Sequence, residues 1–108
     1  MKPVVFLGDS LEVVREFPPD ARREAGFQID KVQRGLSPDH WRPMATIATG
    51  VGEIRIRADS GIYRVLYLAK IRDAVYILHA FQKKTRKTTK ADLDLARSRW
   101  RALVGRQQ

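Results

Sequence analysis

The sequence predicts an α+β fold whose elements follow the order β-α-α-β-β-β-α. Apolar residues at helical spacing gather between residues 10 and 34 and again after residue 88, whereas three strand-like segments follow one another between residues 53 and 81. Because helices and strands are segregated along the chain, a sheet wound alternately with helices is not expected. The length of 108 residues suits one domain, residues 1–108, with a single modest core.

The first third of the chain predicts a short strand followed by two helices. Residues 2–7 (KPVVFL) are rich in β-branched and aromatic side chains, and the following Gly-Asp-Ser interrupts the strand. The Pro18-Pro19 pair ends the first helix, because the residue before a proline avoids the helical conformation. Pro19 or Asp20 is expected to open a second helix, which runs from residue 21 to about residue 34, with Gly35 just beyond its C-terminus. The proline corner predicts that the two helices form an antiparallel hairpin.

Three consecutive strands are expected in the second half of the chain. The first strand alternates charged and apolar residues, and the other two are almost continuously apolar, as strands covered on both faces are. Turn-forming residues at 59–61 and 70–73 separate them, which predicts an antiparallel meander. The expected strands are Glu53–Ala58, Ile62–Ala69 and Ala74–Phe81.

The segments on either side of this meander are less regular. Residues 36–52 contain two prolines and two glycines and are expected to be mainly loop, with one short strand at Thr46–Ala48. The last helix should begin near Thr89, because Thr89 and Asp92 have the spacing of a capping box.

The composition favours a basic, cytoplasmic protein that binds a polyanion. Lys and Arg total 21 against 12 Asp and Glu, so the net charge is +9. Nucleic acid is the commonest partner of such a domain, although an acidic protein partner or a need for solubility alone would give the same charge. The absence of cysteine excludes disulfides and thiolate metal sites, and it suits a reducing cytoplasm. No apolar stretch has the length of a signal-peptide core or of a membrane span.

Three arginines on neighbouring strands form the first candidate site. If residues 60 and 61 make a two-residue hairpin loop, Arg57 lies opposite Arg64, and Arg55 shares their face. Neighbouring like charges on a sheet repel one another, so an anion such as phosphate is expected between them. The alternative is a solvated face on which Glu53 balances one arginine. Arg64 fits this alternative less well, because it is the only charge in an otherwise apolar strand and needs a partner or a purpose.

A basic segment and two further side chains complete the candidates. Residues 82–90 (QKKTRKTTK) lie between a buried strand and a helix N-terminus, where lysines and backbone N–H groups can hold phosphate, although a flexible solubilising loop has the same composition. His79 alternates with apolar residues of its strand, and Tyr63 has core spacing, so both are more typical of core residues than of catalysts. Two isolated histidines do not indicate a metal site. The candidate cations of the basic segment are Lys83, Lys84, Arg86 and Lys87.

Residues 50–100 resemble toxins of the RelE/ParE superfamily, in particular its phage-derived, HigB-like branch. The resemblance is carried by the strand EIRIR at 53–57, the strand YRVLY at 63–67, the strand end HAFQKKT at 79–85, and a final helix rich in Ala and Arg. It implies a RelE-like fold, in which a small twisted antiparallel sheet is packed by a helical hairpin and a C-terminal helix. The first third of the chain agrees in layout and carries no diagnostic motif.

The resemblance also implies a function. Most relatives are toxins of type II toxin–antitoxin modules, are bound by a small helix-turn-helix antitoxin, and cleave mRNA in the ribosomal A site without a metal or other cofactor. The ribose 2′-hydroxyl attacks the neighbouring phosphate, helped by general acid–base groups and by cations that stabilise the transition state. Arg64 matches the phosphate-binding arginine of the family, and Lys83 lies among the basic residues that follow the last strand. The cations expected to support catalysis are Arg55, Arg57, Arg64 and Lys84.

The sequence departs from these relatives at its C-terminal end. Several relatives carry a tyrosine or histidine there as acid or base, whereas residues 85–108 contain neither. The general base is therefore unassigned, and His79 and Tyr63 are candidates only if their side chains reach the arginine face. The predicted pairing directs Tyr63 to the opposite face. A gyrase-inhibiting toxin of the ParE kind, and a catalytically weak member that binds only its antitoxin or nucleic acid, are the alternative functions.

Overall fold

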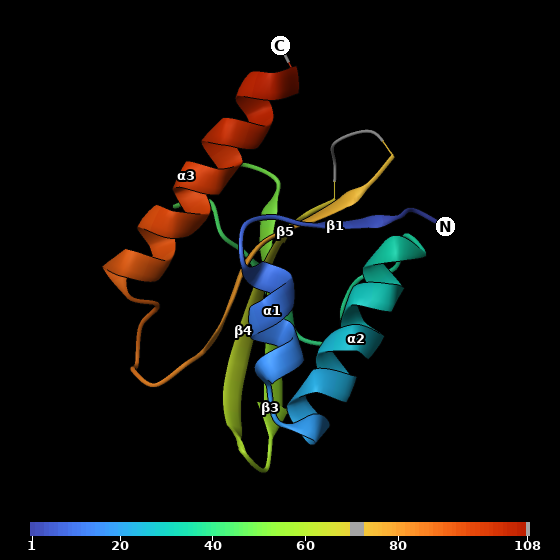
Figure 1. Cartoon of the computed structure of the whole chain (residues 1–108), viewed down its shortest axis with the longest axis vertical. Coiled ribbons are helices and arrows are strands. Elements are labelled where there is room, and N and C mark those ends of the chain that lie inside the picture. The colour runs from blue at the N-terminus through green and yellow to red at the C-terminus, as the bar shows by residue number, and fades with distance from the viewer. Residues whose placement is uncertain (70–72, 108) are drawn as a thin grey trace.

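The protein contains one five-stranded sheet with helices on both faces (Figure 1). The computed structural model describes residues 1–69 and 73–107. Helices α1 and α2 pack on one face of the sheet and helix α3 packs on the other, which confirms the predicted α+β class. The elements are β1 (Val4–Phe6), α1 (Ser10–Glu16), α2 (Pro19–Gln33), β2 (Trp41–Pro43), β3 (Val51–Ala58), β4 (Gly61–Leu68), β5 (Val75–Gln82) and α3 (Lys90–Gln107).

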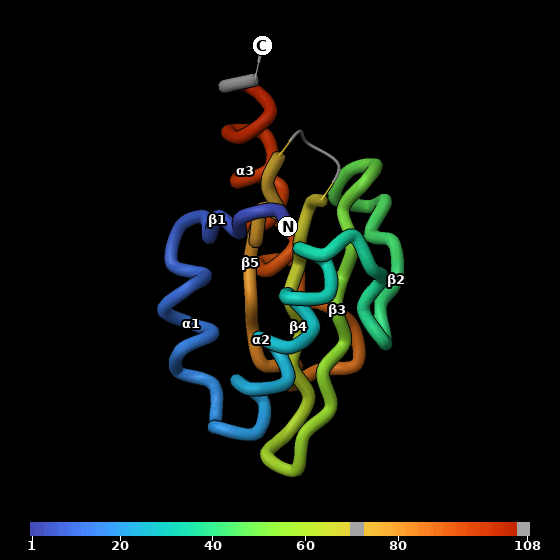
Figure 2. The backbone as a smooth tube through the Cα atoms, turned by 90° about the vertical axis from the view of Figure 1, so that its right-hand side faces the viewer, coloured from blue at the N-terminus to red at the C-terminus, as the bar shows by residue number. Residues whose placement is uncertain are grey.

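The α1–α2 pair forms the predicted helical hairpin (Figure 2). Pro19 occupies the first position of α2, where the backbone N–H that proline lacks would have no partner within the helix. The helix therefore begins at residue 19, one of the two residues expected to open it. Gly35 follows its C-terminus with a φ of +82°, a conformation that glycine adopts without a steric penalty.

The sheet is mixed: the expected antiparallel pairing holds from β2 to β5, and β1 adds a parallel strand at the edge. β1 pairs with β5 in parallel, with Val4 opposite Val75 and Phe6 opposite Ile77. Neighbouring parallel strands need a long connection, which the intervening elements from α1 to β4 provide. β3, β4 and β5 do form the predicted antiparallel meander.

An edge strand forms within a segment expected to be loop. β2 pairs antiparallel with β3, and Pro43 is tolerated there because it lies on the edge of the sheet. The strand expected at Thr46–Ala48 is wrong, because the backbone N–H groups of Ile47 and Ala48 instead donate to the carbonyl oxygen of Met44 in a turn. β2 therefore adds a row of residues to the sheet beside β3.

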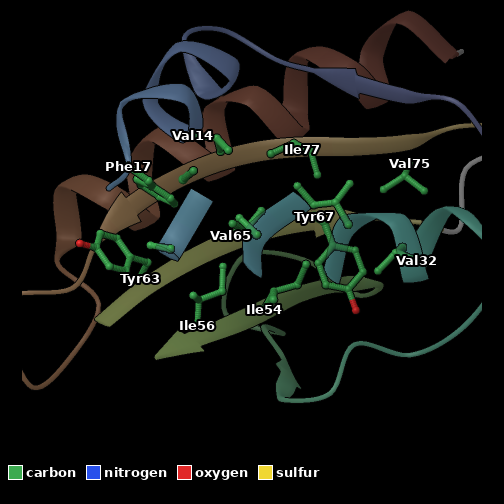
Figure 3. Close-up of a cluster of buried hydrophobic side chains, with 14 residues drawn as sticks. Val14, Phe17, Val32, Ile54, Ile56, Tyr63, Val65, Tyr67, Val75 and Ile77 are labelled. Carbon is green, nitrogen blue, oxygen red and sulfur yellow. The ribbon is translucent and has the colours of Figure 1, made fainter. Parts of the chain in front are cut away.

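Two buried clusters hold the helices against the sheet. The larger cluster lies between the sheet and the helical hairpin, where Phe17 and Tyr63 pack with ring centroids 4.7 Å apart (Figure 3). The smaller one lies under α3 and includes Leu66, Ala96 and Leu103. Burial on both faces of β4 confirms the interpretation of its continuous apolar pattern.

A bulge in β5 changes which face its residues occupy. His79 lies opposite Leu66 and Ile77 lies opposite Tyr67, so Leu78 has no partner on β4. Ile77 belongs to the cluster under the hairpin, whereas Leu78 belongs to the cluster under α3 and His79 bonds to a residue of α3. Simple alternation would place His79 and Ile77 on the same face, and the bulge reverses that relation.

Helix α3 begins as the sequence predicts. The hydroxyl oxygen of Thr89 accepts a hydrogen bond from the backbone N–H of Asp92 at 3.1 Å, which is half of the expected capping box. The carboxylate of Asp92 does not complete the box, because it accepts hydrogen bonds from the Thr89 hydroxyl and from His79.

Of the turn predicted at residues 70–73, only Asp73 lies within the described residues. No helix in the described part of the chain is long and apolar enough to span a membrane.

Candidate functional site

β3 and β4 bring the three predicted arginines to one face of the sheet. Residues 59 and 60 form the hairpin loop, in place of the expected 60 and 61. Arg55 therefore lies opposite Arg64, and the expected pairing of Arg57 with Arg64 is wrong. The correction shifts the pairing by two residues, and such a shift leaves every side chain on its original face. The three arginines therefore lie on one face of the sheet, as predicted, although Arg64 has a different partner.

The three arginines line one hollow, which we call the arginine hollow. Its volume is about 370 Å³. Arg55 and Arg57 are exposed, whereas Arg64 is buried with only 5% of its surface exposed. No carboxylate is among the described residues that line it, so an anion entering the hollow would meet arginines. The lining residues are His40, Arg55, Ile56, Arg57, Ile62 and Arg64.

A buried carboxylate lies beside the arginine hollow. The side chain of Glu53 is fully buried, and its Oε1 lies 3.0 Å from Nε of Arg42 and 3.4 Å from Nε of Arg64. Thr88 donates a hydrogen bond to Oε2 at 3.3 Å. Arg64 thus has a partner, as a lone charge in an apolar strand requires. Glu53 balances Arg64 in the way that the solvated-face alternative assigned to one arginine, although the pair is buried.

Arg64 is held in place on both sides of its guanidinium. Its Nη1 donates a hydrogen bond to the carbonyl oxygen of Tyr63 at 3.0 Å, while its Nε faces Glu53 without forming a hydrogen bond. Burial lowers the pKa of Arg64, the charge of Glu53 opposes this effect, and the neighbouring Arg55 lowers the pKa further. An arginine remains charged despite such shifts, so Arg64 contributes a fixed positive charge to the hollow.

The basic segment after β5 forms a second hollow that adjoins the first. This hollow has a volume of about 420 Å³ and shares Arg55 with the arginine hollow. Burial lowers the pKa of Lys83 below its usual value, and the nearby charge of Arg64 lowers it further. The cations that line the second hollow are Arg42, Arg55, Lys83, Arg86 and Lys87.

Lys84 does not join either of these hollows. It lines a smaller hollow of about 170 Å³ together with Lys83, Lys87 and Asp92. The structure therefore brings three of the four cations predicted in the basic segment to Arg55 and separates Lys84 from them. The segment is also tied to the sheet, because the backbone N–H of Lys83 donates to the carbonyl oxygen of Ile62 at 2.7 Å.

The two weaker candidates lie outside the arginine hollow. Tyr63 is 2% exposed and faces the helical hairpin, as the predicted pairing indicates, and its hydroxyl donates to Oγ of Ser60 at 3.0 Å. His79 is buried on the α3 side of the sheet, where its Nε2 lies 2.7 Å from Oδ1 of Asp92. Its ring stacks on Phe81 with centroids 5.3 Å apart. Both side chains are therefore parts of the packed interior.

Two residues that the sequence does not indicate as part of the site contact it in the structure. Arg42 reaches Glu53 because β2 pairs with β3, and His40 lines the arginine hollow from the segment just before β2. Predicting a strand at Trp41 would have placed both residues beside β3. The prolines of this segment indicated a loop instead. Among the described residues, no group of three or more histidine, aspartate or glutamate side chains is arranged to hold a metal ion.

The structure is that of a small basic α+β protein with a cationic hollow on one face of its sheet. The sequence assigns this protein to a family. Residues 12–101 match the family described as "Phage derived protein Gp49-like (DUF891)". Because the match covers most of the chain, the protein belongs to this family, which lies in the RelE/toxin-like group. Members of the family are often toxins of toxin–antitoxin modules. No curated protein matches the chain.

Proposed function

We propose that this protein is the toxin of a type II toxin–antitoxin module and that it cleaves mRNA on the ribosome. The arginine hollow is the observation that carries the proposal. Arg55 and Arg64 lie directly opposite each other on neighbouring strands, an arrangement in which like charges repel. Glu53 lies within ion-pair distance of Arg64, whereas no carboxylate of the described residues does so for Arg55 or Arg57. A bound phosphate would relieve this repulsion.

The arginines suit the transition state of RNA cleavage by the 2′-hydroxyl. When the 2′-oxygen attacks phosphorus, negative charge grows on the non-bridging oxygens, and fixed donors aimed at those oxygens stabilise it. Arg55 and Arg57 are exposed and would bind those oxygens through their planar guanidinium groups. Arg64 is already held by Glu53 and Tyr63, so its charge needs no reorganisation during the reaction.

The second hollow would bind the neighbouring part of the RNA strand. It is lined by cations and by the apolar side chains of Met44 and Leu93, and it meets the arginine hollow at Arg55. Cations bind the phosphate backbone irrespective of sequence, and apolar side chains offer surface to a base. The proposed antitoxin, a small helix-turn-helix protein, would neutralise the toxin by covering this basic surface.

Induced expression in a bacterial host tests the function. Growth should stop, and primer extension should show cuts within translated mRNA. Arg57→Gln should restore growth, whereas Arg23→Gln should not. Arg23 is an exposed arginine on α2, which packs on the face of the sheet opposite to the arginine hollow. Growth arrest with intact mRNA and DNA-damage signalling would contradict the proposal and favour a gyrase-inhibiting toxin. Normal growth would contradict it in favour of a member that only binds its antitoxin or nucleic acid.

A further inference from the structure

We infer that the imidazole of His40 is the base that takes the proton from the 2′-hydroxyl of RNA in the arginine hollow. This role applies only if the protein cleaves RNA as proposed above. His40 is exposed and lines the hollow together with the three arginines and two isoleucines. Arginine keeps its proton and isoleucine has none to exchange, whereas histidine is the residue type that gains and loses a proton near neutral pH.

The pairing of β2 with β3 directs His40 to the arginines. Trp41 lies opposite Ile54, and the backbone N–H of Arg55 donates to the carbonyl oxygen of His40 at 2.8 Å, which extends the pairing by one residue. Residues directly opposite on antiparallel strands point to the same face. Because Arg55 is in turn opposite Arg64, His40, Arg55 and Arg64 form one row across the sheet.

The residue before His40 is anchored to α2. The backbone N–H of Asp39 donates to Oε1 of Gln28 at 2.8 Å, and Nε2 of Gln28 donates to Oδ2 of Asp39 at 2.8 Å. Lys31 forms an ion pair with the same carboxylate. These contacts lower the pKa of Asp39, with Lys31 as the largest cause and Gln28 as the second. Since Gln28 is buried, His40 is attached to a fixed point of the fold rather than to a free loop.

The carboxylate next to His40 in the chain, that of Asp39, is held by α2 and does not line the hollow. Asp39, on its own segment, is engaged by Lys31 of α2, while Arg55 and Arg57 of β3 and Arg64 of β4 face the hollow. Glu53 is buried and engaged by Arg42 and Arg64. The lining thus contains three permanent cations for the phosphate and one side chain that can accept a proton.

The chemical step balances without a further reactant except water. An imidazole nitrogen of His40 takes the proton of the 2′-hydroxyl, and the 2′-oxygen forms a bond to the adjacent phosphorus. The bond from phosphorus to the 5′-oxygen breaks, and this oxygen takes a proton from water. The remaining hydroxide takes the proton back from the imidazolium, which restores neutral His40. The products are a 2′,3′-cyclic phosphate and a 5′-hydroxyl.

The test uses the purified protein, ribosomes and a translated mRNA. His40→Ala should slow cleavage by about 10²- to 10⁴-fold, the usual contribution of a general base, while binding to ribosomes changes little. Added imidazole should restore part of the rate in His40→Ala, because the substitution removes the imidazole ring from the lining of the hollow and leaves its place to the free base. A residue with only a structural role would not be rescued in this way. The wild-type rate should fall in acid as histidine is protonated, and His40→Gln should lose this dependence.

The controls distinguish the inference from the proposed function. His79→Gln should keep the acid dependence, because His79 is the only other histidine and is bonded to Asp92. Unchanged cleavage by His40→Ala, or an acid dependence that disappears in His79→Gln and persists in His40→Gln, would overturn the role of His40 alone. Intact mRNA with the wild-type protein would overturn the proposed function as well.

Discussion

Replacing Glu53 with glutamine should destabilise the protein by about 3 kcal/mol, because the change leaves Arg64 buried without its counter-charge. The side chains of Glu53 and Arg64 are 0% and 6% exposed, so water cannot take over the lost interaction. Removing one partner of a buried ion pair typically costs about 3–5 kcal/mol. The lower end applies here, because Nε of Arg64 is 3.4 Å from the carboxylate and Nη1 keeps its bond to the Tyr63 carbonyl.

Arg42 provides the matched control for this prediction. It contacts the same carboxylate oxygen at 3.0 Å, closer than Arg64 does, yet its side chain is 48% exposed. Solvent-exposed ion pairs contribute about 0–1 kcal/mol, so Arg42→Gln should cost far less than Glu53→Gln. Burial rather than distance therefore decides which of the two pairs matters.

Urea unfolding followed by circular dichroism measures the effect. With a slope of about 2 kcal/mol per molar urea, a loss of about 3 kcal/mol lowers the midpoint by about 1.5 M. The double variant Glu53→Leu with Arg64→Met should recover most of this loss, because an apolar pair of similar volume removes both buried charges. The reasoning is wrong if Glu53→Gln unfolds at the wild-type midpoint or if Arg42→Gln costs as much.

Two further predictions concern salt and acid. Arg57→Gln should reduce the slope of log K against log salt concentration for single-stranded RNA by about 0.7, the value for one lost phosphate contact, whereas Arg23→Gln should leave it unchanged. A slope equal to that of wild type would remove Arg57 from the interface. Asp9, Asp20 and Asp39 have a pKa below the usual 3.8, chiefly because of Arg99, the backbone N–H of Ala21, and Lys31, respectively. A carboxyl group whose folded pKa is lowered stabilises the fold above its unfolded pKa and loses this effect as the pH falls through the folded value. The urea midpoint should therefore fall below about pH 4, and it should fall less in the Asp39→Asn variant; an identical fall in that variant would contradict the assignment.

The face of the sheet to which the arginines belong was predictable, whereas their partners were not. Side chains alternate along a strand, so only the parity of the hairpin determines whether Arg57 and Arg64 share a face. The loop at residues 59 and 60 preserves that parity and moves the partner of Arg64 to Arg55. Hairpin loops that differ by one position at each end are equally compatible with the apolar pattern, so the pattern alone could not select the pairing.

The residues that surround the arginines depend on contacts between distant parts of the chain. Trp41–Pro43 shows no alternation and contains a proline, and it becomes a strand because β3 offers an unpaired edge. The parallel pairing of β1 with β5 likewise joins segments separated by most of the chain. Leu78, at the bulge, packs in the cluster under α3, and no local feature of the sequence indicates the bulge. Alternation therefore placed His79 correctly beside Phe81 and wrongly on the face of Val75 and Ile77.

The buried carboxylate links the stability of the fold to the charge of the proposed binding surface. Glu53 on β3 contacts Arg42 on β2, Arg64 on β4 and Thr88 just before α3, so one side chain connects the rims of both hollows. Glu53→Gln would make the surface more positive and strengthen its attraction for RNA, while it loosens the elements that position Arg55 and Lys83. Tighter RNA binding together with slower cleavage in this variant would show that the arrangement of the cations matters more than their number. Faster cleavage would show the reverse, because charge alone would then limit the reaction.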